Sequence, residues 1–339
     1  MNRSPFFALI LRVSLFLTLS APLTFAQKIT TFDIPGGIAT TPTGITPSGR
    51  IVGYYGDQQA VAVRGFVRKA DGKITLFDAP DSNYTLPSGV NASGQIVGFY
   101  GENLDPGYLQ VGFLRNADGM ITTFSLPEGG VTSPVDINAW GQVVGYWVDP
   151  GQVSHGFVRN PGGTITSFDA GSGGYIGTIP VAINLFGQST GYFDDSTGPV
   201  EHGFLREADG TIKTFDVPGA TDTSPAGINL RGQIIGFYAD GSALHGFLRQ
   251  ADGNIQTIDV PGATNTAPIA INSRGQIAGF YADQTSALHG FLREADGNIR
   301  TFDVPNATKT LPTAMNSRGE ITGYFYDSNG DLHGFIRNP

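Results

Sequence analysis

Residues 268–305 read PIAINSRGQIAGFYADQTSALHGFLREADGNIRTFDVP, and the chain after residue 27 is built from variants of this stretch. The stretch holds four short runs rich in β-branched and aromatic residues: AIN, GQIAGFY, HGFLR and IRTFDVP. Glycine, asparagine and aspartate separate these runs at the positions where tight turns need them. Each copy therefore predicts a unit of four short β-strands.

The copies recur at nearly constant spacing. The phenylalanine of the TFD phrase, replaced once by isoleucine, recurs every 43 to 47 residues, at Phe32, Phe77, Phe124, Phe168, Phe215, Ile258 and Phe302. A period of about 40 to 50 residues with four strands per copy is typical of propeller blades. Helical repeats are excluded, because the chain after the first 26 residues shows no sustained helical period. The sequence predicts an all-β fold, a seven-bladed β-propeller with four strands per blade.

A second marker predicts how the ring closes. The phenylalanine of HGFLR occurs at Phe66, Phe113, Phe157, Phe204, Phe247, Phe291 and Phe335. The first six precede a TFD-type position by 11 residues, but Phe335 has no such partner before Pro339. Phe32 is the unmatched TFD position, so residues 28–35 are expected to pair into the last blade. Closure removes free sheet edges, and residues 27–339 are expected to form a single propeller domain.

The first 26 residues have the features of a secretory signal peptide. They carry Arg3 and Arg12, an apolar run over residues 13–23, and Thr-Phe-Ala before residue 27. A membrane anchor is the alternative, but this run is shorter than the ~20 residues that a span needs. We therefore expect no membrane span and a secreted or periplasmic protein.

Composition excludes several classes of function. Cleavage after residue 26 would leave 18 basic against 29 acidic residues, a net charge of −11, which disfavours nucleic acid as a partner. The chain has no cysteine, so it has neither disulfides nor thiolate metal sites. Motifs for serine hydrolases, zinc peptidases, phosphate-binding loops and calcium loops are missing. We expect no cofactor, no metal and a monomer.

All five histidines precede Gly-Phe in the third predicted strand. If the ADG turn is a three-residue loop, residues fourteen apart face each other across the hairpin. This predicts the pairs His155 with Asp169, His202 with Asp216, His245 with Asp259 and His289 with Asp303, while His333 would meet Asp33 across the closure. A repeated pair with no placed serine is not a catalytic triad. We interpret the pairs as structural, charge-assisted hydrogen bonds.

Two copies depart from this pattern. Arg64 replaces histidine in the first copy and its counterpart Asp78 stays acidic, whereas Val111 replaces histidine in the second copy and its counterpart is Ser125. The cation and the carboxylate therefore change together.

The order AIN-x-x-GQIxG-(F/Y)-Y, then HGFLR, then a TFD phrase resembles the extracellular repeat family known as HAF, named for His-Ala-Phe where this chain has His-Gly-Phe. The resemblance covers the chain after the predicted signal peptide. It implies an exported bacterial β-rich repeat protein with no assigned activity.

The connections that vary most between copies all lie on one predicted face, opposite the tight turns. Three of these connections, after the second strands of the N-terminal copies, carry carboxylates near aromatic residues. Such residues on loops suit a glycan or a cationic peptide. The candidate ligand-binding residues are Trp147, Asp149, Tyr175, Asp194 and Asp195. The predicted function is a non-catalytic binding module; the alternatives are a glycan lyase or hydrolase that uses loop carboxylates, and a structural envelope or matrix component.

Overall fold

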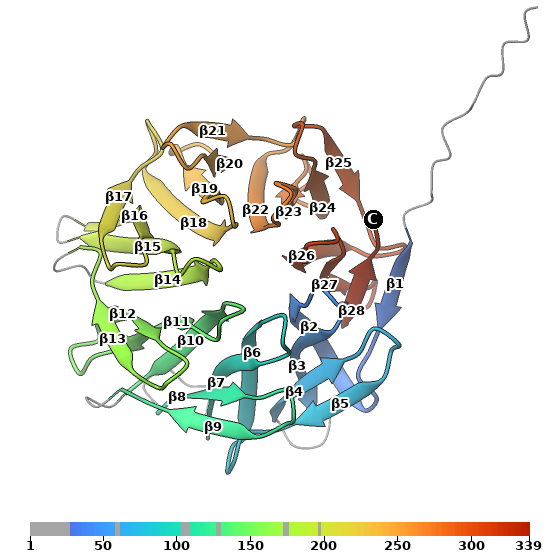
Figure 1. The fold of residues 1–339 in the computed structure, drawn as a ribbon. Coiled ribbons are helices and arrows are strands. Elements are labelled where there is room, and N and C mark those ends of the chain that lie inside the picture. The colour runs from blue at the N-terminus through green and yellow to red at the C-terminus, as the bar shows by residue number, and fades with distance from the viewer. Residues whose placement is uncertain (1–27, 58–61, 103–108, 127–129, 172–175, 196–197) are drawn as a thin grey trace, which may run out of the picture.

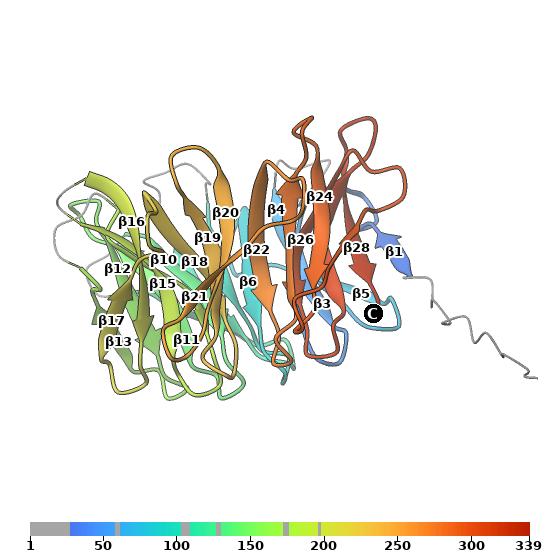
Figure 2. The same cartoon turned by 90° about the horizontal axis from the view of Figure 1, so that it is seen from above.

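The computed structural model describes residues 28–57, 62–102, 109–126, 130–171, 176–195 and 198–339, which form 28 β-strands and no helix. The strands lie in groups around a ring (Figure 1). Seen from its edge, the ring has most strands running across its thickness (Figure 2). The all-β prediction is confirmed.

Four sheets in the middle of the chain have four antiparallel strands each, ordered in space as along the chain. The first strand of each sheet faces the centre of the ring and the fourth lies at its rim (Figure 1). Their strands are β10 (Thr132–Ile137), β11 (Val143–Val148), β12 (Ser154–Arg159), β13 (Ile165–Phe168); β14 (Thr178–Ile183), β15 (Ser189–Asp195), β16 (Gly198–Arg206), β17 (Ile212–Phe215); β18 (Asp222–Ile228), β19 (Ile234–Ala239), β20 (Leu244–Arg249), β21 (Ile255–Ile258); β22 (Asn265–Ile271), β23 (Ile277–Ala282), β24 (Leu288–Arg293) and β25 (Ile299–Phe302).

The remaining strands form one twelve-stranded mixed sheet. They are β1 (Ile29–Phe32), β2 (Gly37–Ile45), β3 (Ile51–Asp57), β4 (Val63–Arg68), β5 (Ile74–Phe77), β6 (Tyr84–Val90), β7 (Ile96–Gly101), β8 (Val111–Arg115), β9 (Ile121–Phe124), β26 (Lys309–Met315), β27 (Ile321–Tyr326) and β28 (Leu332–Arg337). Two parallel contacts of a single residue pair each, Ala39 with Leu332 and Val63 with Tyr84, join antiparallel groups into this sheet.

The N-terminal strand β1 lies in the same group as the last strands of the chain. It pairs antiparallel with β28, with Phe32 opposite Gly334. The backbone N–H of Asn338 also donates a hydrogen bond to the carbonyl of Lys28 at 3.0 Å. Strand β1 therefore occupies the rim position beside β28 that β5 and β9 occupy beside β4 and β8 (Figure 1).

Aromatic rings and arginines hold neighbouring groups together. Phe124 of β9 contacts Phe157 of β12 edge to face, with centroids 6.2 Å apart, and the Arg159 guanidinium lies 4.9 Å above the Phe124 ring. Phe32 of β1 makes the same two contacts with Phe66 and Arg68, at 6.2 and 4.9 Å. Each such edge-to-face pair adds about 0.5 to 1.5 kcal/mol beyond the burial of the rings.

Side-chain amides join the innermost turns around the ring. The Asn91 amide donates to the backbone carbonyl of Asn138 at 3.1 Å, and the series continues to Asn316, which donates to the Thr46 carbonyl at 2.9 Å. The intermediate donors are Asn138, Asn184, Asn229 and Asn272. Because these amides are buried, each bond satisfies polar groups that water does not reach.

Candidate functional site

The structure brings each histidine to the aspartate expected opposite it. The Nδ1 atom of each ring lies 2.8 to 3.1 Å from a carboxylate oxygen. The pairs are His155 with Asp169, His202 with Asp216, His245 with Asp259, His289 with Asp303 and His333 with Asp33. Each histidine is on a third strand, and its aspartate immediately follows the neighbouring fourth strand.

Each of these sites also holds an aromatic ring, and most hold a second carboxylate. In the sixth copy the His289 ring stacks on Tyr281 of β23, with centroids 5.1 Å apart, and its Nε2 lies 3.4 Å from Asp283. The Nε2 atoms of His155, His245 and His333 lie 3.4 to 3.8 Å from Asp149, Asp240 and Asp327. In these four copies both ring nitrogens therefore face carboxylate oxygens.

Two observations support a cation at this position. Burial lowers the pKa of His289, but the hydrogen bonds and charges of Asp303 and Asp283 outweigh that effect, so the pKa is raised. In the first copy Arg64 bridges the equivalent carboxylates, with Nε 3.2 Å from Asp57 and Nη1 2.5 Å from Asp78. In the first and sixth copies a cationic side chain thus lies between two carboxylates beside an aromatic ring.

Most of the candidate ligand residues that the structure describes make contacts within the protein. Trp147 is 7% exposed, stacks on His155 and donates from Nε1 to Ser167 at 3.1 Å. Asp149 accepts the Val153 N–H at 2.8 Å, and the buried Asp194 accepts the N–H of Gly177 at 2.6 Å. Trp147 and Asp149 therefore occupy the aromatic and carboxylate positions of the third-copy histidine site. Tyr175 lies outside the described residues, as does the side chain of Asp195.

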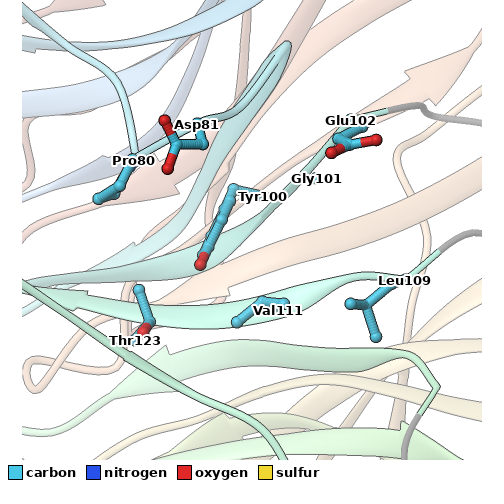
Figure 3. A pocket seen from close by; sticks show the side chains of 8 residues that line it. All are labelled: Pro80, Asp81, Tyr100, Gly101, Glu102, Leu109, Val111 and Thr123. Atoms are coloured by element: carbon cyan, nitrogen blue, oxygen red, sulfur yellow. The ribbon is translucent and has the colours of Figure 1, made fainter.

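A pocket lies where the second copy lacks its histidine. Val111 of β8 is the cross-strand partner of Tyr100 of β7, just as His289 is the partner of Tyr281. Tyr100 and Val111 line a hollow of about 440 Å³ with Pro80, Asp81, Gly101, Glu102, Leu109 and Thr123. Figure 3 shows Tyr100 at the centre of the pocket, with Val111 and Leu109 along one side. The volume is within the usual range of small-molecule sites.

Two exposed carboxylates flank this pocket without a cation among the described residues. Glu102 follows Tyr100 by two residues, the offset by which Asp283 follows Tyr281. Glu102 therefore occupies the loop-carboxylate position of the repeat. Val111 occupies the position where other copies have histidine or arginine. Asp81 lies on the other side of Tyr100 from Glu102 and also lines the hollow (Figure 3). The lining thus combines the apolar side chains of Val111 and Leu109 with two carboxylates.

Asp81 has an unfavourable backbone conformation. Its φ is +53°, while the equivalent position holds Gly36, Gly219 and Gly262 with φ between +80° and +84°, and Asn306 with φ +64° in the sixth copy. A side chain in this region costs free energy, although aspartate tolerates it better than most residues. Non-glycine residues held in such regions cluster at functional sites. The carboxylate of Asp81 is thus present at a position where the repeat favours glycine.

A second hollow, of about 340 Å³, lies at the innermost tight turns, on the face opposite the long connections. Turn residues equivalent to one another around the ring line it, including Asn138, Asn184 and Asn229. The side chains of Trp140 and Phe186 on these turns are 69% and 63% exposed.

On the innermost strand β10, burial raises the pKa of Asp136, although the N–H groups of Ile183 and Ile137 donate hydrogen bonds to its carboxylate.

The 440 Å³ pocket was not predicted from the sequence, although Val111 was recognised as the residue that replaces histidine in the second copy. A signal was present, because Val111 and Ser125 mark the one copy that lost both the cation and its partner. At the level of sequence this exception supported only the pairing of cation and carboxylate. Asp81 could have been found as the acidic residue at a glycine position of the repeat.

Two kinds of site are absent from the residues that the structure describes. They contain no helix long and apolar enough to cross a membrane. No group of three or more histidine, aspartate or glutamate side chains in the described ranges is arranged to hold a metal ion.

Comparisons with known proteins support the fold. No family model matches the sequence, and no curated protein matches it. A streptogramin B lyase structure matches with a TM-score of 0.58 at 15% identity, over 92% of this chain and 98% of that one.

Two further matches come from Pyrococcus proteins. The β-propeller domain of the trilobed protease from Pyrococcus furiosus gives a TM-score of 0.59 at 8% identity, over 93% and 94% of the two chains. The Pyrococcus horikoshii acylaminoacyl peptidase gives 0.62 at 10%, over 90% of this chain and 52% of that one. At such identities these matches show the fold alone, which is that of a β-propeller.

Proposed function

We propose that this protein is an exported seven-bladed β-propeller that acts as a non-catalytic binding module. The blades are the seven four-stranded units of the repeat, and β1 closes the ring as the rim strand of the last one. The pairing of β1 with β28 and the contacts of Phe32 with Phe66 and Arg68 support this closure. Residues 1–26 are proposed as the signal peptide and residues 27–339 as one monomeric domain of HAF-like repeats.

The ligand, a glycan or a peptide, is proposed to enter the pocket formed by Tyr100, Glu102, Val111 and Asp81. One observation carries this assignment: the pocket lies at the copy where the repeat has lost its histidine and aspartate. A residue retained for the scaffold recurs around the ring, whereas a departure that opens a pocket has no role in the scaffold. Tyr175 and Asp195 stay candidates for a wider contact on the same face.

The test compares the wild-type protein with a variant in which the pocket is filled. Val111→His with Ser125→Asp restores the repeat's own pair, so the variant should fold and its imidazole should occupy the space beside Tyr100. Both proteins, without residues 1–26, are applied to a glycan array and a peptide array. A ligand retained by the wild type and lost by the variant supports the proposal. Equal retention by both proteins would place the site elsewhere.

The same experiment separates the alternative functions. Product analysis of each retained ligand would reveal a glycan lyase or hydrolase, since an enzyme converts what it binds. Asp194 is a poor candidate for that chemistry, because it is 2% exposed and its carboxylate is occupied by backbone N–H groups. Neither retention nor turnover would favour the structural envelope component.

A further inference from the structure

We propose that the pocket at Tyr100 binds the side chain of an arginine from a peptide partner, in the place where the other copies hold their own cation. This inference rests on the proposed function and specifies its ligand. The repeat itself supplies the template. Glu102 occupies the loop-carboxylate position of the repeat. Its counterparts Asp57 and Asp283 contact Arg64 and His289.

The first copy shows how a guanidinium fits this frame. Arg64 is the cross-strand partner of Tyr55, as Val111 is of Tyr100. Its Nε and Nη1 atoms reach carboxylates that belong to different connections. A guanidinium entering the second copy would find Glu102 on one side and Asp81 on the other, because both line the same hollow.

The shape and polarity of the pocket favour arginine over lysine. A planar guanidinium donates to two carboxylates in a fixed fork and stacks flat on an aromatic face, while a lysine ammonium is a compact charge without the fork or the flat surface. Tyr100 supplies the aromatic face. Val111 and Leu109 supply apolar contact for the methylene stem.

Charge favours a cationic partner. The protein carries a formal net charge of −9, and its acidic surface attracts cationic partners. Free arginine carries an α-carboxylate that Asp81 and Glu102 repel and an α-ammonium that they attract, so the two effects offset each other. In a peptide both groups are amides, and the guanidinium alone carries the attraction.

The test uses four small probes and NMR chemical-shift titration of the protein without residues 1–26, at low salt. The probes are Nα-acetyl-arginine amide, its neutral isostere Nα-acetyl-citrulline amide, Nα-acetyl-lysine amide and free arginine. The acetylated arginine should bind, with shifts at Tyr100, Gly101 and Val111. The citrulline and lysine probes should bind at least about fivefold more weakly, the difference expected for one hydrogen-bonded charge in a partly exposed pocket. Free arginine should bind no more tightly than the acetylated amide.

Two variants test the role of the pocket residues. Glu102→Gln keeps the size of an exposed side chain and should weaken the arginine probe by about threefold to tenfold, whereas Glu102→Asp should retain part of the binding. Val111→His with Ser125→Asp should abolish it. Unchanged NMR shifts elsewhere would show that each variant is folded.

Several results would overturn the inference: no binding of the arginine probe, equal binding of citrulline, tighter binding of lysine or free arginine, or no effect of Glu102→Gln. If an array ligand without a cation is still lost on filling the pocket, the binding-module proposal survives and only the arginine assignment fails. If filling the pocket changes the binding of no ligand, both proposals fail.

Discussion

Truncation of Phe32 tests whether β1 is an integral strand of the ring. The Phe32 ring contacts Phe66 edge to face at 6.2 Å and lies under the Arg68 guanidinium at 4.9 Å. Phe32→Ala should lower the free energy of unfolding by about 2 to 4 kcal/mol, the lower part of the range for large-to-small core changes because the ring is only partly buried. Phe32→Ile imitates Ile258 of the fifth copy and should cost about 1 to 2 kcal/mol, because it keeps apolar bulk but loses both ring contacts.

The chain offers a matched control for this experiment. Phe302 of β25 makes the same contacts with Phe335 at 6.3 Å and Arg337 at 4.9 Å, but its strand is internal to the chain. Phe302→Ile should therefore cost about as much as Phe32→Ile. Urea unfolding followed by circular dichroism gives the comparison. A cost below about 0.5 kcal/mol at Phe32, beside a clear loss at Phe302, would refute closure by β1.

Three further predictions concern individual contacts. Asp81→Gly should raise the free energy of unfolding by up to about 1 kcal/mol, because glycine adopts the left-handed backbone conformation without strain, and it should weaken ligand binding. A lower free energy of unfolding would show that Asp81 is not strained. A double-mutant cycle on His289 and Asp303 should give about 0.5 to 1 kcal/mol near pH 5.5. Because the folded-state pKa of His289 is raised above 6.5, its contribution should be complete below that pH and lost as pH rises through the folded value. A coupling energy between His289 and Asp303 that does not change with pH would exclude a charged pair. The pKa of Asp283 is lowered to about 2, so the stability that this carboxylate contributes should be lost only as pH falls from about 4 toward 2. Asn184→Ala should cost about 1 to 2 kcal/mol, because it leaves the buried carbonyl of the next turn without its donor, and an unchanged urea midpoint would show that the amide series is dispensable.

Much of the fold could be predicted from the sequence because the repeat supplies the same signal many times. The offset between Phe66 and Phe77 recurs along the chain and fixes one hairpin, so any irregular copy is outweighed by the regular ones. The same redundancy allowed the partner of His155 to be predicted as Asp169, since hairpin register follows from the length of the turn.

The candidate site was harder to predict because a residue type that occurs in one copy only can have the same structural role as its counterparts in the other copies. Trp147 differs from the tyrosine or phenylalanine of other copies, yet its ring also stacks on a histidine. Asp149 looked specific to its loop, but it is the third copy's version of Asp283. The pocket beside Val111 depends on the volume left by a missing imidazole, which only the packed structure shows.

A map of where a ligand binds on the ring tests directly whether the pocket at Tyr100 is the binding site. Backbone amide shifts of the protein without residues 1–26, titrated with the tightest array ligand, distinguish the two hollows in one experiment. The largest changes should fall at Tyr100, Gly101, Glu102 and Val111, and they should disappear when Val111→His and Ser125→Asp fill the pocket. Changes confined to the opposite turn face, around Asn138 and Asn184, would contradict the proposed binding site.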